Sequence, residues 1–482
     1  MAETLKEKTA KGLFWGGVSN GVQQVLNLVF GIFLARMLSQ SDYGMVGMLT
    51  IFSAVAGSLQ EGGFISALNR KKNVTHKDYN AVFWFNISVG FLLYLILFFC
   101  APLIARFYGI PELTPLARFI FIGLFISSLG IVPSAIMYRN LMVKESAICS
   151  FVTLIVSGSL GVMLAANGFA YWGIAIQTVV HVFMSLLLRL YFVKWHPSLK
   201  IDFSPIKEMI GFSCKLIATN IFNTINGNIF PIILGKLYSA REVGNYTQAN
   251  KWNNMGSTLV GSMVGSVAQP VFAKVDDDVM RQKRVFRKLL RFTAFVSFPA
   301  MFGLALVAKE FIVILLTEKW LESALMMQML CVAGAFAPVS SLFSNLIVAR
   351  GHSTTYMWCT ISLCLAQLAA AFLSVPYGID TMIMVYVAIN ICWILVWHHY
   401  AHKEISLNLF EVIKDISPYL LLATAFVCLA VFLTKDIANL YLSFIVKVLT
   451  VSILYALSLW LLKSAIFKEF ILFVTKRHIN EE

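Results

Sequence analysis

The chain has 482 residues, of which 59% are hydrophobic and 13% are charged, and its mean hydropathy is +0.78. A soluble domain is nearer to half apolar and a quarter charged, so this composition excludes an ordinary soluble protein. The net charge of +14 could indicate nucleic-acid binding, but Lys and Arg also accumulate in the cytoplasmic loops of membrane proteins. We therefore expect an integral membrane protein that binds no nucleic acid.

Apolar runs that are long enough to cross a bilayer follow one another along the whole chain. A transmembrane helix needs roughly 20 apolar residues, and charged, Pro or Gly residues divide the sequence into about fourteen such runs. The predicted spans are 12–34, 44–68, 81–105, 115–138, 147–166, 170–192, 210–235, 243–272, 292–316, 323–349, 355–375, 379–400, 416–433 and 440–462. The predicted fold class is therefore an all-α integral membrane protein.

Most Lys and Arg residues fall in the N-terminal tail, in every second loop and in the C-terminal tail. Positive residues resist translocation, so this alternation places both termini on the cytoplasmic side. The densest basic segment, 274–291, mixes seven cations with apolar residues. We expect it to be amphipathic and to lie on the anionic inner leaflet.

The first and seventh predicted spans are related by a shift of 200 residues without a gap. The identities are Phe30, Ile32, Leu34, Ser39 and Gly44 over residues 230, 232, 234, 239 and 244, and Arg36 and Asp42 match Lys236 and Glu242 in charge. Because six spans separate the copies, both halves have the same orientation in the membrane. We therefore expect two parallel six-helix lobes and two further C-terminal helices.

The repeat also predicts the domain boundaries. The expected domains are an N-lobe at 1–192, a cytoplasmic connector at 193–209, a C-lobe at 210–401, and a segment at 402–482 with the last two spans and a cytoplasmic tail. Two such lobes are typical of transporters that work by alternating access around a midplane site.

Polar side chains inside the predicted membrane concentrate in the first two spans of each half. Because polar and charged groups are costly in a bilayer, they usually face a cavity or a partner. We expect them to line a hydrated cavity between the lobes. The candidate substrate-binding residues are Gln24, Glu61, Lys215, Asn220, Asn223, Asn250 and Lys251.

Each candidate also has a structural interpretation. Lys215 lies near the cytoplasmic end of its span, from which its ammonium group could reach the interface. Glu61 could form a structural ion pair with Lys215 or take up a coupling proton. Asn and Gln side chains often join transmembrane helices by hydrogen bonds.

The chain contains no Walker A or HExxH motif and no dinucleotide-binding glycine motif. His398 and His402 have a spacing that can hold a metal, but no convincing carboxylate ligand accompanies them in the sequence. We expect no catalytic residues, no enzymatic activity, no metal site and no cofactor. A proton or a sodium ion is left open as the coupling ion.

The N-terminal seventy residues resemble the polysaccharide transporter family, the Wzx-type flippases. The resemblance rests on Lys11-Gly12-Leu-Phe-Trp15, on Leu34 through Gly44, and on Glu61-Gly-Gly63-Phe64 with Ala67-Leu68. This family belongs to the multidrug/oligosaccharidyl-lipid/polysaccharide superfamily. The resemblance implies that undecaprenyl-diphosphate-linked oligosaccharides are carried across the bacterial inner (cytoplasmic) membrane for O-antigen, capsule or exopolysaccharide synthesis.

The resemblance also implies which molecules the protein meets. The partners would be the lipid-linked oligosaccharide, membrane lipids, a polysaccharide polymerase and a chain-length regulator. Related lipid II flippases use a cluster of cavity arginines, whereas the first span here carries amides. Lys215 and Lys251 are our substitutes for those arginines as partners of the diphosphate.

Two other functions compete with the flippase. A cation-coupled drug or metabolite exporter of the same superfamily commonly has twelve helices and a more apolar pocket. A membrane polysaccharide polymerase or ligase usually needs a substantial external loop, and the longest one predicted here, around 107–114, is short.

Overall fold

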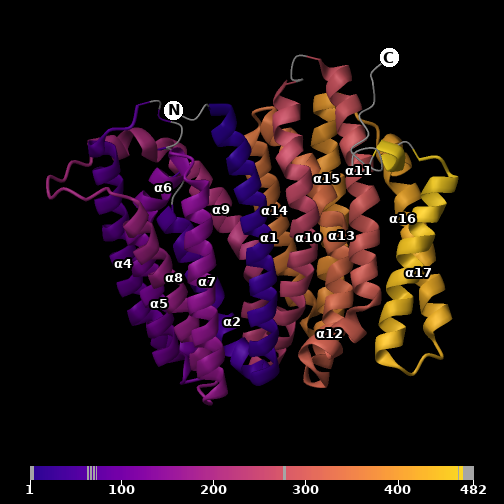
Figure 1. Ribbon diagram of the computed structural model, residues 1–482, viewed down its shortest axis with the longest axis horizontal. Coiled ribbons are helices and arrows are strands. Elements are labelled where there is room, and N and C mark those ends of the chain that lie inside the picture. Colours follow the sequence, from indigo (N-terminus) through magenta and orange to yellow (C-terminus); the bar gives the residue numbers. More distant parts are fainter. Residues whose placement is uncertain are drawn as a thin grey trace. The chain divides into compact units, whose positions relative to one another are not determined.

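The computed structural model describes residues 5–61, 65, 68, 71, 73–274, 278–464 and 466–469 (Figure 1). All regular secondary structure within these residues is helical. The all-α prediction is therefore confirmed for the part of the chain that the structure describes. Contacts divide the chain into two compact units, Met1–Gly244 and Asn245–Glu482, which we call unit 1 and unit 2.

Unit 1 is a bundle in which α4 packs on α5, α7 packs on α8 and on α1, and α2 packs on α9 (Figure 1). Its helices are α1 (Leu5–Met37), α2 (Gln40–Glu61), α4 (His76–Tyr108), α5 (Leu113–Leu129), α6 (Ile131–Arg139), α7 (Val143–Ala166), α8 (Tyr171–Phe192) and α9 (Ser204–Leu237). Helix α10 (Ala240–Lys274) begins in unit 1 and continues into unit 2.

Unit 2 is built around α11 and α13, which pack on each other. Its helices after α10 are α11 (Val279–Leu306), α12 (Ala308–Leu316), α13 (Leu321–Ala349), α14 (Ser353–Ser374), α15 (Ile379–Ile405), α16 (Leu409–Thr434) and α17 (Leu440–Leu461), with short 3₁₀ helices at Glu318–Trp320 and Val375–Tyr377. Helix α16 packs on α11 and on α17. The last two helices are therefore attached to the rest of unit 2 through α11 and α12.

Local sequence explains where several helices begin and end. At the start of α4, Thr75 and Asp78 form a reciprocal capping box that satisfies otherwise unpaired N–H groups. Gly109 ends the same helix in the left-handed region, with φ 74°, a conformation that glycine adopts without steric cost. Asn408 and Glu411 form an equivalent box at the start of α16.

Large apolar side chains cover the outer surface of the helices. On α4 alone, Phe91, Leu92, Ile96, Phe99 and Leu103 are all exposed. A water-soluble monomer rarely shows contiguous apolar surface on this scale. Such faces are suited to contact with lipid, and they identify a multi-pass membrane protein.

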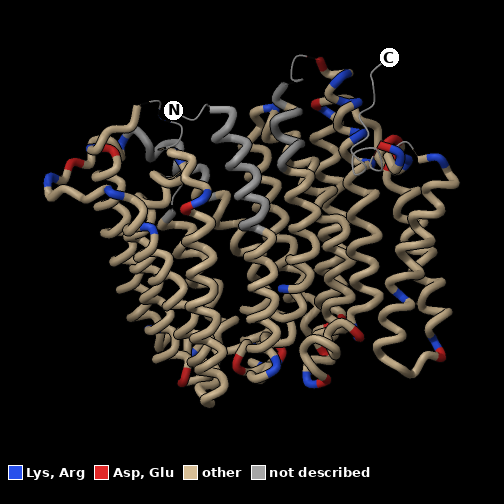
Figure 2. The backbone as a smooth tube through the Cα atoms, viewed as in Figure 1, with Lys and Arg blue, Asp and Glu red and all other residues tan. Residues whose placement is uncertain are grey.

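Ten helices in the described residues are long and apolar enough to cross a membrane, or up to eleven if the bent pair α5–α6 counts as one span. Figure 2 shows that charged residues gather near helix ends and are scarce along the middle of the helices. The remaining predicted spans correspond to α1, α9 and α10, which are helices of 33, 34 and 35 residues. The count of fourteen spans and the lobe boundaries stay predictions.

The structure corrects two predicted elements. The fourth span, 115–138, is not one straight helix, because the chain bends by 44° between α5 and α6. The basic segment is not separate from the ninth span, since α11 runs continuously from Val279. Asp278 caps this helix by accepting a hydrogen bond from Arg281 N at 2.9 Å, and Phe286 and Leu290 are fully buried in unit 2. Their burial explains why the segment joins the bundle.

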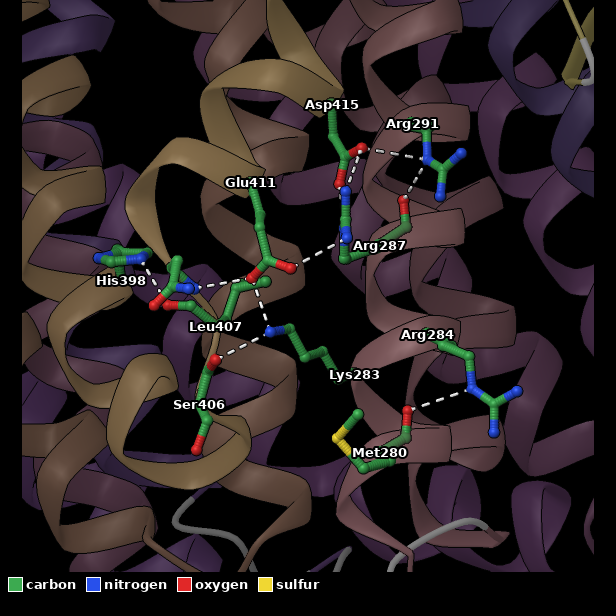
Figure 3. Close-up of polar contacts among 11 residues, drawn as sticks. Met280, Lys283, Arg284, Arg287, Arg291, His398, Ser406, Leu407, Glu411 and Asp415 are labelled. Carbon is green, nitrogen blue, oxygen red and sulfur yellow. Dashed lines mark hydrogen bonds and ion pairs between the residues drawn. The ribbon is translucent and has the colours of Figure 1, made fainter.

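An ionic cluster joins the basic part of α11 to the start of α16 (Figure 3). Arg287 Nε donates to Asp415 at 2.6 Å and Arg287 Nη1 donates to Glu411 at 3.0 Å. Lys283 Nζ lies 2.7 Å from the second oxygen of Glu411. Arg291 Nε lies 3.3 Å from Asp415. Several cations of the basic segment thus bind acidic side chains of α16.

Candidate functional site

The turns after the first and seventh predicted spans have the same structure, as the repeat requires. Helices α1 and α9 end at Met37 and Leu237, and α2 and α10 begin at Gln40 and Ala240. The hydroxyl of Ser39 accepts from Asp42 N at 3.2 Å, and that of Ser239 accepts from Glu242 N at 3.3 Å. The 200-residue repeat is therefore reproduced in the local geometry of these two turns.

Helices of unit 1 are tightly packed at the end where these turns lie. Lys236 Nζ donates to the carbonyl oxygen of Phe107 at 2.6 Å and lies 4.8 Å from the centre of the Phe107 ring. Tyr108 donates to Met48 O at 3.4 Å, and its ring fills the space beside Gly235. These contacts join α2, α4 and α9.

The candidate residues in the described part of unit 1 face outward or lie half-buried. Gln24 of α1 is half-buried, and Asn220 and Asn223 of α9 are exposed on the surface of unit 1. Nearby, the hydroxyls of Ser58 and Thr224 share a hydrogen bond of 2.9 Å between α2 and α9. Exposure of these amides is compatible with a solvated site, and their role stays a prediction.

In unit 2, the candidates Asn250 and Lys251 are half-buried on α10. Lys251 Nζ lies 5.9 Å from the centre of the Trp252 ring. Trp252 is buried and packs edge-on against Phe311 at 5.0 Å. Lys251 therefore lies next to an aromatic anchor of this unit.

Two candidates are not tested by the structure. The side chains of Glu61 and Lys215 lie outside the described residues, although their backbones belong to α2 and α9. Their proposed pairing stays a prediction.

Unit 1 also contains a partly open cavity of about 250 Å³, lined by polar and apolar side chains, between α2, the bent pair α5–α6 and α8. Its polar lining residues are Gln60, Ser127, Ser134, His181, Ser185 and Arg189. Gln60 is buried, donates to Leu124 O at 3.0 Å and accepts from the Ser127 hydroxyl at 3.0 Å. Gln60 thus ties α2 to α5 at the wall of the cavity.

Comparison with known proteins identifies the family. A family model described as "Polysaccharide biosynthesis protein" matches residues 33–325, which is more than half of the chain. The chain belongs to this polysaccharide biosynthesis family. The family predicted from the sequence is therefore confirmed.

Relatives in this family come from different bacteria. The chain is 24% identical over 359 residues to the lipopolysaccharide biosynthesis protein WzxC of Escherichia coli K12, covering 72% of this chain and 71% of that protein. It is 25% identical over 437 residues to the teichuronic acid biosynthesis protein TuaB of Bacillus subtilis, covering 87% and 88%.

The fold of this polysaccharide biosynthesis protein matches a solved lipid transporter. It superposes on the lipid II flippase MurJ, in an inward closed conformation, with a TM-score of 0.75. The match covers 96% of this chain and 99% of that one at 15% sequence identity. The chain therefore has the fold of this membrane transporter.

Sequence reasoning overlooked the cavity, although a signal for it exists. His181, Ser185 and Arg189 are spaced by four residues in a span whose other polar side chains are Gln177 and Thr178 apart from its terminal tyrosines and Trp172, and such a row lies on one face of a helix. A polar stripe in a membrane helix indicates a face turned toward the protein interior or a cavity. The greater number of polar residues in the first two spans of each half pointed to those spans, and the shorter polar row on α8 was not predicted to be part of a site.

Proposed function

We propose that this protein is a flippase that translocates undecaprenyl-diphosphate-linked oligosaccharide repeat units across the bacterial cytoplasmic membrane by alternating access. The products would serve the synthesis of O-antigen, capsule or exopolysaccharide. The observation that carries this proposal is the match to the polysaccharide biosynthesis family over residues 33–325. The fold shared with a lipid II flippase supports it, since that protein's name describes the movement of another lipid-linked headgroup.

The proposed architecture has fourteen spans. Eleven come from the apolar helices, with α5–α6 counted as one, and α1, α9 and α10 complete the set. The two lobes would be 1–192 and 210–401, joined by the connector at 193–209, and 402–482 would add the last two spans. The matching turns at 37–40 and 237–240 support the repeat that underlies this arrangement.

The proposed location is the inner membrane, with both termini in the cytoplasm. The alternation of basic loops along the sequence supports this orientation. The oligosaccharide headgroup would cross within a polar cavity lined by the candidate amides and cations, while the isoprenoid tail would stay in lipid. No chemical bond changes in this process, so it needs no catalytic residue.

Substrate binding is proposed for the polar residues in the first two spans of each half. Amides such as Asn220 and Asn223 can exchange hydrogen bonds with sugar hydroxyls because they both donate and accept. Lys215 and Lys251 would bind the diphosphate by charge-assisted hydrogen bonds. Coupling to a proton, to a sodium ion or to neither is left open, and Glu61 is the candidate proton acceptor if a proton is coupled. A polymerase and a chain-length regulator would act on the transported product.

Flipping by purified protein in liposomes tests the proposal. Vesicles would contain a lipid-diphosphate oligosaccharide, and an external hydrolase would report how much sugar reaches the outer surface under an imposed ion gradient. We expect flipping above that of protein-free vesicles, with a loss in Glu61→Gln, Lys215→Ala or Lys251→Ala. Lys144→Ala, which changes an exposed cation at the start of α7, is the matched control.

The possible results separate the function from the site. Absence of flipping by well-folded wild-type protein under proton and sodium gradients would refute the flippase and favour an exporter. Flipping that is equal in wild type and all three site variants would keep the function and reject the assigned residues.

A further inference from the structure

We propose that the cavity of unit 1 is an anion-binding subsite that receives a phosphate or diphosphate group against Arg189, His181 and Ser185 on the polar side of its lining. The inference rests on the proposed function insofar as it takes the diphosphate of a lipid-linked substrate as the natural ligand. None of the residues that line this cavity is among the substrate-binding candidates.

The chemistry of the lining favours an anion. Arg189 supplies a guanidinium group, whose rigid fork of donors matches phosphate oxygens. Ser134, Ser185 and the imidazole of His181 add further hydrogen-bond donors. Hydrogen bonds between a charged donor and a phosphate are among the stronger ones in proteins.

The fold leaves space beside the guanidinium group. Gly130 lies at the 44° break between α5 and α6, and a Cβ atom there would come within 3.7 Å of Arg189 Nη1. Gly57 of α2 also lines the cavity, and a Cβ atom there would meet nothing within 4 Å. Larger side chains at these positions would extend toward the cavity, so the glycines keep it open.

The size of the cavity limits what it can hold. Its volume of about 250 Å³ is below the roughly 300–1,000 Å³ of pockets that enclose drug-sized ligands. It can accept a phosphate group, a diphosphate group or a single ring, but not an oligosaccharide repeat unit. The rest of a lipid-linked substrate would therefore lie outside it, which the partly open form of the cavity allows.

One member of the α8 row, His181, is held by a neighbouring side chain. His181 Nδ1 lies 3.3 Å from the hydroxyl of Ser157 on α7. Gln60 links α2 to α5 through Leu124 and Ser127, as described above. The lining residues thus belong to helices that are already joined to one another, and a bound anion would meet a preorganised set of donors.

Direct binding to the purified full-length protein in detergent tests the proposal. The probes are inorganic pyrophosphate, farnesyl diphosphate and farnesol, and the readouts are Kd by calorimetry and the shift in Tm. We expect pyrophosphate and farnesyl diphosphate to bind and to raise Tm, while farnesol, which lacks the anion, does not compete with pyrophosphate. Arg189→Gln should weaken binding by about tenfold or more, as expected for the loss of a charged hydrogen-bond donor.

Matched variants separate a local effect from unfolding. Gly57→Leu adds a side chain to the α2 wall of the cavity and keeps Arg189, and it should weaken pyrophosphate binding as Arg189→Gln does. Arg189→Lys keeps the charge and should restore part of the affinity. Lys144→Gln removes an exposed cation outside the cavity and should bind like wild type.

The outcomes are decisive for the subsite. Absence of pyrophosphate binding to wild type, or equal binding by wild type, Arg189→Gln and Gly57→Leu, would overturn it. If farnesyl diphosphate binds at least tenfold more tightly than pyrophosphate, the result would support the subsite with a lipid headgroup as its ligand. Equal affinities of the two probes would support the subsite with free phosphate compounds as its ligands. Because this assay needs no transport, binding without flipping would refute only the proposed function, and flipping without binding would refute only the subsite.

Discussion

Gly44 of α2 lies directly against the backbone carbonyl of Ala240 at the start of α10, so closely that a Cβ atom at position 44 would overlap the carbonyl oxygen. Gly244 has the reciprocal relationship with the carbonyl of Gln40. Both pairs are related by the 200-residue shift found in the sequence. The two repeats therefore meet in a symmetric backbone contact that only glycine permits at these positions.

Gly44→Ala and Gly244→Ala should each destabilise the protein, because the added methyl group forces the starts of α2 and α10 apart. Overpacking of this kind typically costs about 1–3 kcal/mol. Denaturant unfolding would measure the change in the free energy of unfolding. Gly21→Ala is the control, since a Cβ atom there meets nothing within 4 Å, and it should be neutral or slightly stabilising. Equal stability of wild type and both test variants would contradict the close contact.

Arg287→Met should loosen the attachment of α16 to α11. Arg287 bridges Glu411 and Asp415 (Figure 3). The side chain of Asp415 is only 5% exposed, so removal of the Arg287 guanidinium leaves a nearly buried carboxylate without its bidentate partner. We expect faster hydrogen exchange at the start of α16. Arg284→Met is the control, because Arg284 Nε donates to the carbonyl of Met280 in its own helix. Exchange that rises equally in both variants would argue against a specific role of Arg287.

The connector at 193–209 is attached to α4 by an ion pair and hydrogen bonds, and Asp202→Asn should weaken this attachment. Lys77 Nζ lies 2.7 Å from Asp202, and Asn80 donates to Lys200 O and accepts from Ser198 N at 2.8 and 2.7 Å. The ion pair with Lys77, followed by the hydrogen bonds from Ser204, holds the pKa of Asp202 below its usual value. The pKa of Asp202 is lower in the folded state than in the unfolded state, where it has the ordinary value of about 3.9. The ionised carboxylate therefore stabilises the fold fully above this ordinary pKa, and the stabilisation is lost as pH falls through the lower pKa of the folded state.

Two measurements check this attachment. Between pH 8 and pH 5, hydrogen exchange of residues 195–203, corrected for its intrinsic pH dependence, should stay constant in wild type. Asp202→Asn should exchange faster at every pH in that range. Protection that falls in wild type on going from pH 8 to pH 5 would show that another titrating group controls the connector.

The sequence predicted the helices of this protein well because membrane spans need long apolar runs. The predicted spans 170–192 and 440–462 differ from α8 and α17 by a single residue at one end. The bend at Gly130 and the early start of α11 were missed, because both depend on packing: Gly130 lies beside side chains of α8, and Phe286 is buried in unit 2. Hydropathy reports how apolar a segment is, and not what it packs against.

The candidate site was less predictable than the fold. Asn223 and Lys251 were chosen because polar residues are costly in lipid, a criterion that also fits Gln60 and His181. The cavity forms only when α2, α5, α6 and α8 come together, and no spacing within one helix encodes that meeting. Lys447 is a second example. The sequence shows a lysine within an apolar span, but it does not show the partner of that lysine, Glu310, which is 137 residues away.

Glu310 and Lys447 form a buried ion pair between α12 and α17 that should be essential for holding the last helix in place. Lys447 Nζ lies 2.5 Å from Glu310 Oε1, and the two side chains are 14% and 6% exposed. Ser443 donates to the same oxygen at 3.0 Å. Removing one partner from a buried pair leaves an uncompensated charge, which typically costs about 3–5 kcal/mol.

Lys447→Met and Glu310→Gln should therefore each lower the stability of the protein strongly, and the double variant should lose much less than the sum of the two. A double-mutant cycle on the free energy of unfolding measures this coupling. Lys435→Met, which changes an exposed cation in the turn between α16 and α17, should have little effect and serves as the control. Additive losses in the double variant would mean that the two side chains stabilise the protein independently, and the attachment of α17 would then rest on its apolar contacts with α12 and α16.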